Sequence, residues 1–92
     1  MEIYRFVDYM GQKAFLFCFK DWQAYEVIKD FGTYIVGNHW TSSEEPIEFI
    51  HSQCRAINAE TRTGIQEIKR VLYRNLPKLV KQYIKENIEY DS

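Results

Sequence analysis

The apolar residues between Thr63 and Glu86 recur at the spacing of an α-helix, and no other pattern in the chain constrains the fold as strongly. At about 100° per residue, one side of this predicted helix carries Ile65, Ile68, Leu72, Leu76, Leu79 and Tyr83. The opposite side carries five basic residues, namely Arg70, Arg74, Lys78, Lys81 and Lys85. The pattern predicts an amphipathic helix that packs on a core with one face and presents cations with the other.

Pro77 lies inside this pattern. A proline within a helix removes one hydrogen bond and clashes with the preceding turn, at a cost of about 3 kcal/mol. A strict interpretation therefore ends the helix at Leu76 and lets Asn75 cap a new one. The apolar residues nevertheless form three pairs spaced by 11 residues, which keeps one helix face aligned: Ile65 with Leu76, Ile68 with Leu79, and Leu72 with Tyr83. We expect a continuous helical region with a kink near Pro77.

The composition is that of one compact domain spanning residues 1–92. Hydrophobic residues make up 46% of the chain and aromatic residues 16%, which distinguishes it from a disordered segment. Cys18 and Cys54 are too few for the disulfide framework of a small secreted domain, so we expect reduced thiols in a cytoplasmic protein. The longest apolar run is Ala14 to Phe19 and no leader precedes it, so we expect neither a signal peptide nor a membrane span.

Two runs rich in aromatic and other β-favouring residues predict a β-hairpin between Ile3 and Lys20. With Gly11-Gln12 as a two-residue turn, Phe6 pairs with Phe17. The inner face of this predicted hairpin consists of Tyr4, Phe6, Phe15, Phe17 and Phe19. Its outer face is half apolar, so that it must be covered by helices, by a second copy or by another protein.

The residues after the hairpin predict a short helix and a third strand. Asp21 is a suitable N-cap and Gly32 a suitable C-terminal residue for a helix over 22–31. Thr33 to Trp40 is expected to form a strand with a bulge at Gly37. A right-handed crossover would place this strand beside the first one, in the order 2-1-3.

A second amphipathic helix is predicted to begin at Ser42-Ser43-Glu44-Glu45-Pro46 and to end around Asn58. Its apolar residues recur at helical spacing and are Ile47, Ile50, Cys54 and Ile57. The fold class that follows is α+β, with a sheet and one helix in residues 1–41 and helical structure in residues 42–92.

Charge is distributed unevenly along the chain. The net charge is −1, but residues 61–85 carry seven basic residues and one acidic residue. A cationic helix face of this kind binds an acidic protein surface or nucleic-acid phosphates. Its simpler interpretation is a solvated helix face, and no zinc-finger spacing, RNA-binding motif or leucine zipper accompanies it.

Three other candidate sites have simpler structural interpretations. His51 and Cys54, with Cys18 and His39, have the ligand atoms of a metal site, but Cys54 lies on the apolar stripe and the spacing fits no zinc motif. The same side chains have no third group to orient a nucleophile and base. Asn38-His39-Trp40 with Trp22 and Tyr25 has the composition of a ligand pocket, although aromatic residues at strand ends more often cover a core.

The sequence thus predicts a small non-enzymatic protein-binding or regulatory module without metal or cofactor. Its contacts are expected from the basic helix, centred on Arg70, Arg74 and Lys78, or from the outer sheet face. The expected partner is a protein with an acidic surface or a second copy in a homodimer, and not a membrane. The alternative is a nucleic-acid-binding regulator that uses the same basic helix.

Overall fold

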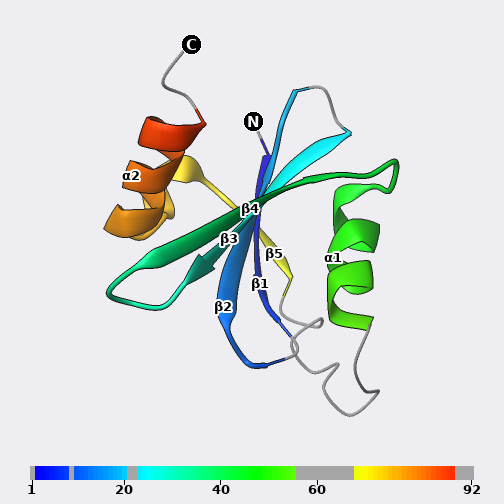
Figure 1. Cartoon of the computed structure of the whole chain (residues 1–92), viewed down its shortest axis with the longest axis horizontal. Coiled ribbons are helices and arrows are strands. Elements are labelled where there is room, and N and C mark those ends of the chain that lie inside the picture. Colours follow the sequence, from blue (N-terminus) through cyan, green and yellow to red (C-terminus); the bar gives the residue numbers. More distant parts are fainter. Residues whose placement is uncertain (1, 9, 21–22, 56–67, 89–92) are drawn as a thin grey trace.

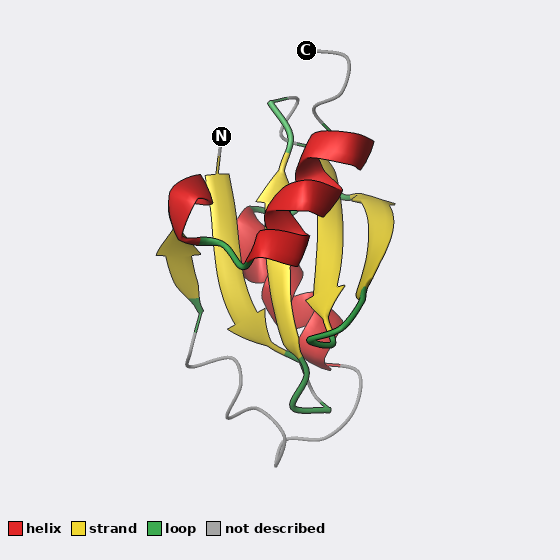
Figure 2. Cartoon of the chain, turned by 90° about the vertical axis from the view of Figure 1, so that its left-hand side faces the viewer, coloured by secondary structure: helices red, strands yellow, loops and turns green. Residues whose placement is uncertain are grey.

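An antiparallel sheet lies between two helical layers, which confirms the predicted α+β class (Figures 1 and 2). The computed structural model describes residues 2–8, 10–20, 23–55 and 68–88. Within these ranges five strands pair in the order β4-β3-β2-β1-β5. The strands are β1 (Glu2–Val7), β2 (Lys13–Cys18), β3 (Ala24–Asp30), β4 (Ile35–Thr41) and β5 (Lys69–Val71). The helices are α1 (Pro46–Arg55), the short 3-10 helix η2 (Tyr73–Asn75) and α2 (Lys78–Asn87).

The helix α1 covers one face of the sheet and α2 covers the other (Figures 1 and 2). Successive side chains of a strand point to opposite faces, so the strands at the centre of the sheet contribute to two separate cores. This is why the run from Ala14 to Cys18 is apolar at every position and buried throughout. Both faces of the sheet are therefore covered by helices of the same chain, and the apolar residues predicted for a half-apolar outer face are divided between the two cores.

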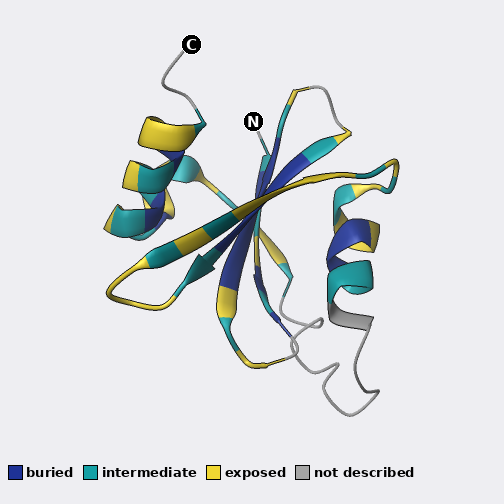
Figure 3. Cartoon of the chain, viewed as in Figure 1, coloured by how far each residue is buried: buried dark blue, intermediate teal, exposed yellow. Residues whose placement is uncertain are grey.

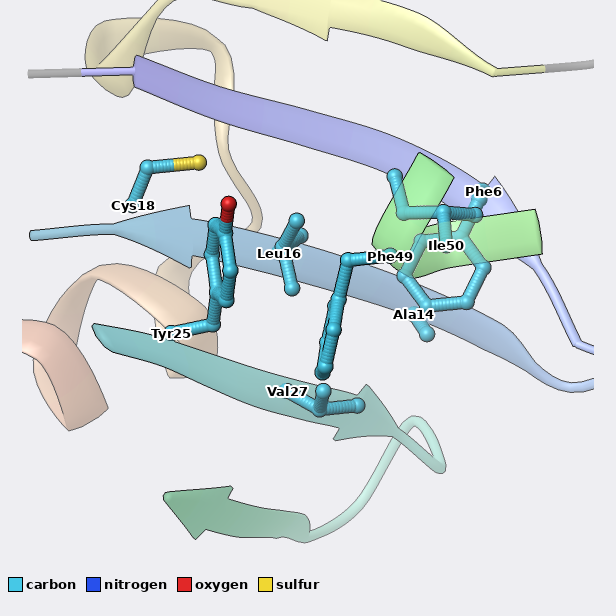
Figure 4. Close-up of a cluster of buried hydrophobic side chains, with 8 residues drawn as sticks. All are labelled: Phe6, Ala14, Leu16, Cys18, Tyr25, Val27, Phe49 and Ile50. Atoms are coloured by element: carbon cyan, nitrogen blue, oxygen red, sulfur yellow. The ribbon is translucent and has the colours of Figure 1, made fainter. Parts of the chain in front are cut away.

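The core beneath α1 combines strand residues with two residues of the helix (Figure 4). Its buried members are Phe6, Ala14, Leu16, Cys18, Tyr25, Val27, Phe49 and Ile50. Phe49 stacks on Tyr25 with ring centroids 4.6 Å apart. The start of α1 agrees with the predicted one. Ile47, which was predicted to lie in the core, is instead 48% exposed, and Phe49 is buried in its place. The predicted end near Asn58 and Ile57 lie outside the described residues.

The core beneath α2 contains the other half of the strand residues. Its buried members are Ile3, Phe15, Phe17, Ile28, Leu76, Val80 and Ile84. Figure 3 shows that burial is greatest along the middle of the sheet and least along β4. None of the helices in the described ranges is long and apolar enough to span a membrane.

The predicted register of the first hairpin was wrong by three positions, because Phe6 pairs with Ala14 and not with Phe17. The connection is a longer loop, in which the Asp8 side chain accepts hydrogen bonds from the backbone N–H of Met10 (2.9 Å) and Gln12 (2.8 Å). An odd shift turns one strand over relative to the other. Tyr4 and Phe6 therefore lie on the α1 face, whereas the predicted face partners Phe15, Phe17 and Phe19 lie on the α2 face.

The predicted helix over residues 22–31 was also wrong, because these residues contain β3. Tyr25, Glu26, Val27 and Ile28 are all buried, since the strand is covered on both faces. A strand of this kind is apolar without alternation, and its positions 24, 27 and 28 match helical spacing by coincidence. Gly32, with φ +90°, belongs to the turn between β3 and β4. The predicted N-cap Asp21 lies outside the described residues.

The predicted third strand exists as β4, but its expected position was wrong. It pairs with β3 at the edge of the sheet, because β1 to β4 follow one another as antiparallel neighbours with no crossover between them. The order 2-1-3 is thereby replaced by β4-β3-β2-β1-β5. Gly37 pairs with Ile28 in an unbroken register, so there is no bulge.

The continuous helix predicted from Thr63 to Glu86 was wrong in the part that can be compared. Residues 63–67 lie outside the described ranges, and the following residues form β5, η2 and then α2. Pro77 has an extended conformation (φ −57°, ψ 150°) and precedes the first residue of α2. The proline therefore precedes a helix and does not kink one. The strict interpretation was correct that a new helix begins here, but its cap is Pro77 and not Asn75, which lies in η2. Leu72, which the helical pattern placed in the core, is 55% exposed.

Candidate functional site

The outer side of β4 is an edge at which no described strand pairs. Backbone hydrogen bonds run from Phe31 N to Tyr34 O (3.0 Å) and from Ser42 N to Gln23 O (3.0 Å) at the two ends of the β3–β4 ladder. They show which residues of β4 direct their N–H and C=O groups toward β3 and which direct them away. The even-numbered residues of β4 bond to β3. The N–H and C=O groups of its odd-numbered residues, Ile35, Gly37, His39 and Thr41, therefore point away from the sheet.

The composition of β4 does not protect this edge. Its seven residues include no Lys, Arg, Asp, Glu or Pro, although these are the residues with which sheets usually block pairing at an edge. The opposite edge strand β5 is three residues long and carries Lys69 and Arg70. Among the described strands, β4 is thus the edge suited to pairing with another strand.

Apolar side chains accompany the free backbone groups of β4. Val36 is 39% exposed and Trp40 43% exposed. Val36 pairs with Lys29 and Trp40 pairs with Tyr25. Both therefore lie on the α1 face, because Tyr25 belongs to the core beneath α1 and odd-numbered residues of β3 share its face. The Trp40 ring contacts the Phe49 ring edge-to-face, with centroids 6.2 Å apart. We call Val36, Asn38, Trp40 and the outward backbone groups the β4 edge surface.

On the α2 face a polar cluster joins α2 to β3 and β4. The buried carboxylate of Glu26 accepts a hydrogen bond from the Tyr83 hydroxyl (2.5 Å) and lies 3.4 Å from His39 Nδ1. Burial, the hydrogen bond to Glu26 and the charge of Glu26 raise the pKa of Tyr83 above its usual value of 10.0. We call Glu26, His39 and Tyr83 the Glu26 cluster.

Gly37 provides the space that Tyr83 needs. A Cβ atom at Gly37 would lie 1.9 Å from the Tyr83 hydroxyl oxygen and 2.2 Å from the adjacent ring carbon. A side chain at this position would require the Tyr83 ring to move from its present place beside Glu26. The glycine predicted to form a bulge thus has a packing function.

The Glu26 cluster resembles a carboxylate–imidazole pair of the kind that acts as a general base. The described contacts of His39 are with Glu26 and with the ring of Phe19 (centroids 5.4 Å apart), and neither supplies a nucleophile. The contacts that the structure describes therefore give the cluster a packing function, which is to attach α2 to the sheet.

A hollow of about 310 Å³ lies at the end of the sheet next to the start of α1. It is lined by Glu2, Cys18, Phe19, Lys20, Tyr25, Glu45 and Pro46. Burial, reinforced by the charge of Glu2, raises the pKa of Cys18 to about 12. The thiol is therefore protonated at neutral pH, whereas a nucleophilic cysteine requires a thiolate.

The pocket residues considered from sequence do not come together, and neither do the candidate metal ligands Cys18 and His39; the side chain of Cys54 lies outside the described part of the chain. Of the five pocket residues, Tyr25 lines the hollow, Asn38, His39 and Trp40 lie along β4, and Trp22 lies outside the described residues. Cys18 packs on the α1 face and His39 points to the α2 face. Within the ranges that the structure describes, no three His, Cys, Asp or Glu residues are placed to share a metal ion.

The five predicted basic contact residues occupy three elements. Arg70 lies in β5 opposite Tyr4, on the α1 face of the sheet. Arg74 lies in η2, and Lys78, Lys81 and Lys85 lie in α2 on the other face. The single five-cation stripe is therefore wrong, because it required the continuous helix. The three lysines of α2 still share one side of that helix.

Comparisons with known proteins supply no assignment. No family model, curated protein or solved structure matches this chain.

The β4 edge surface was missed from sequence, although one signal was present. The residues from Ile35 to Thr41, which follow the turn at Gly32, include no charged residue and no proline. This composition indicates a pairing edge only when the strand lies at the edge of the sheet, and the sequence did not show that position.

Proposed function

We propose that this protein is a small non-enzymatic protein-binding module that takes up an extended strand along β4. The observation that carries the proposal is the unprotected edge: outward backbone groups at four alternate residues, no charge and no proline. Strand addition uses such groups for main-chain hydrogen bonds, and it uses alternate side chains for specificity.

The side chains of β4 define the partner strand. Val36 and Trp40 lie on one face and are about two-fifths exposed, so the bound segment places apolar residues against them. His39 lies on the other face, where the imidazole is oriented by Glu26. The partner is thus an extended segment with alternating apolar residues, and the free thiol of Cys18 supports a cytoplasmic location for the complex.

Peptides selected from a displayed library against the immobilised protein test this function. Trp40→Ala should weaken their binding about tenfold or more, because an aromatic anchor loses its contact area. Leu72→Ala is the matched control, since Leu72 is 55% exposed but is not part of β4. Backbone NMR shifts should map the bound peptides to residues 35–41. Equal affinity for both variants, or shifts confined to other elements, would contradict the proposal.

A nucleic-acid-binding regulator is the second candidate. Lys78, Lys81 and Lys85 share one side of α2, and neither ion pair among the described residues involves them. Binding to phosphates through these lysines and Arg74 would weaken steeply as salt increases. A mobility-shift titration with single- and double-stranded nucleic acid over a range of salt concentrations tests it. Absence of binding at low salt would eliminate this candidate.

A further inference from the structure

We propose that the strand bound by β4 is β4 of a second copy, so that two chains form one continuous sheet around a two-fold axis at Asn38. The inference rests on the strand-adding function proposed above and specifies its occupant. Each chain contributes the five strands described above, and these form ten in the joined sheet.

The outward backbone groups define the register of this pairing. Asn38 is the midpoint of β4, which runs from Ile35 to Thr41. Antiparallel pairing centred on Asn38 places Gly37 opposite His39 of the second copy, and Ile35 opposite Thr41. All four residues with outward N–H and C=O groups then exchange hydrogen bonds in closely spaced pairs. Shifting the centre to Gly37 or His39 leaves one end of each strand unpaired.

The same register makes the exposed apolar side chains complementary to themselves. Val36 and Trp40 lie at equal distances along the chain from Asn38, so Val36 of each copy faces Trp40 of the other. These are non-hydrogen-bonded positions, at which side chains approach most closely. The half-exposed surfaces of Val36 (39%) and Trp40 (43%) therefore cover each other.

A two-fold axis perpendicular to the sheet keeps both copies of α1 on one side. On the other side, His39 of each copy faces Gly37 of its neighbour. Glycine adds no side chain there, and the hydroxyl end of Tyr83 occupies the space above it. The Glu26 cluster of each chain thus borders the junction.

Charge favours β4 over β5 as the self-pairing edge. No charged side chain of β4 is brought opposite another, because the strand has none. Self-pairing through β5 would instead bring Lys69 and Arg70 near their own copies, and like charges across a ladder destabilise it. The second copy is therefore a partner that the β4 edge surface accepts without electrostatic cost.

Opposite charges at Asn38 test the two-fold axis directly. Asn38 is exposed and faces its own copy in the proposed dimer. Asn38→Lys and Asn38→Asp should each weaken dimerisation at least tenfold, because two like charges then meet at the axis. An equimolar mixture of the two variants should recover the dimer. Sedimentation equilibrium over a wide concentration range distinguishes the 11.1 kDa chain from a particle of twice that mass.

Asn75→Lys and Asn75→Asp are matched controls, since Asn75 is exposed in η2 and should leave the dimer unchanged. Thr41→Pro is a second disrupting variant, because its N–H points outward and the β3–β4 ladder does not use it. Circular-dichroism melts verify that each variant is folded.

A native chain that remains monomeric at every concentration overturns the inference. So does a dimer that survives both Asn38 variants and Thr41→Pro, or a mixture that fails to reassociate. If selected peptides still bind the β4 edge surface of a monomeric native chain, the strand-adding function stands and only its assignment to a second copy fails. If a dimer forms elsewhere and no peptide binds β4, both fail.

Discussion

At the scale of single residues, the contact between Gly37 and Tyr83 shows how one missing side chain positions a helix. Tyr83 fills the space above Gly37 and donates its hydroxyl to the buried carboxylate of Glu26. The hydrogen bond to a charged acceptor contributes about 1.5–3 kcal/mol. It also satisfies a carboxylate oxygen that would otherwise be costly to bury.

Gly37→Ala should lower the free energy of unfolding by about 2 kcal/mol, because its Cβ collides with the Tyr83 ring. In a Tyr83→Ala background the same change should cost less than about 0.5 kcal/mol. A double-mutant cycle by urea unfolding measures the difference. Tyr83→Phe is the control: the ring remains within collision distance, so the cost of Gly37→Ala should persist. An equal cost in all backgrounds would contradict the contact.

Tyr83 also predicts a loss of stability at alkaline pH. Its pKa is raised in the folded state by burial and by Glu26, so the folded protein retains the phenolic proton more strongly than the unfolded chain. The resulting stabilisation is complete below pH about 10, the unfolded pKa of tyrosine, and is lost as the pH rises above it. Urea unfolding at increasing pH should therefore show a shallower decline for Tyr83→Phe than for the native chain. Parallel declines would contradict this assignment.

The Glu26 cluster could not be predicted from periodicity. Glu26 and Tyr83 are separated by 57 residues, and their contact depends on the strand order and on the face to which each side chain points. The strand order was mispredicted, because residues 22–31 matched a helix as well as a strand, and without β3 no sheet face could be predicted for Glu26. A one-position error in face is enough to move Glu26 from the α2 core to the other side of the sheet.

At the scale of secondary-structure elements, local capping signals were reliable where tertiary burial did not compete. Ser42-Ser43-Glu44-Glu45-Pro46 predicted the start of α1, and the side chain of Ser42 accepts a hydrogen bond from the N–H of Glu44 (3.1 Å) there. The first hairpin was also predicted from its composition. The helix from Thr63 failed because Ile68 and Val71 enter two different cores, and helical spacing does not contain that information.

Substitutions of Asp8 test how much its hydrogen bonds stabilise the loop between β1 and β2. Its carboxylate accepts the N–H groups of Met10 and Gln12 and lies 3.3 Å from Lys29 Nζ. Asp8→Ala should reduce the free energy of unfolding by about 1–3 kcal/mol, because two loop amides lose their acceptor. Asp8→Asn retains an acceptor oxygen and should cost less. Thermal and urea unfolding compare the two variants, and an equal cost would attribute the effect to the ion pair.

At the scale of the whole molecule, the sheet separates two cores that share the same strands. Ile50 of α1 is buried on one face, and Ile84 of α2 is buried on the other. Residues alternate between these cores along β1, β2 and β3, so neither face can lose its helix without exposing half of every central strand. This arrangement leaves β4 as the one described edge with free backbone groups and no protecting charge.

Ile50→Ala and Ile84→Ala should each lower the free energy of unfolding by about 2–4 kcal/mol, because each leaves a cavity in a closed core. Since the two sites lie on opposite faces and share no partner side chain, the double variant should lose the sum of the two within about 0.5 kcal/mol. Ile47→Ala, at a position 48% exposed on α1, is the control and should stay within about 0.5 kcal/mol of the native chain.

Urea unfolding followed by both fluorescence and circular dichroism measures these costs. Every variant should unfold in one transition that both probes report alike, because the strands between the cores belong to both of them. Separate transitions for the α1 and α2 faces, or a coupling above about 1 kcal/mol, would contradict the additive expectation. The first result would mean that each helix unfolds from the sheet on its own. The second would mean that strain in one core passes through the strands to the other.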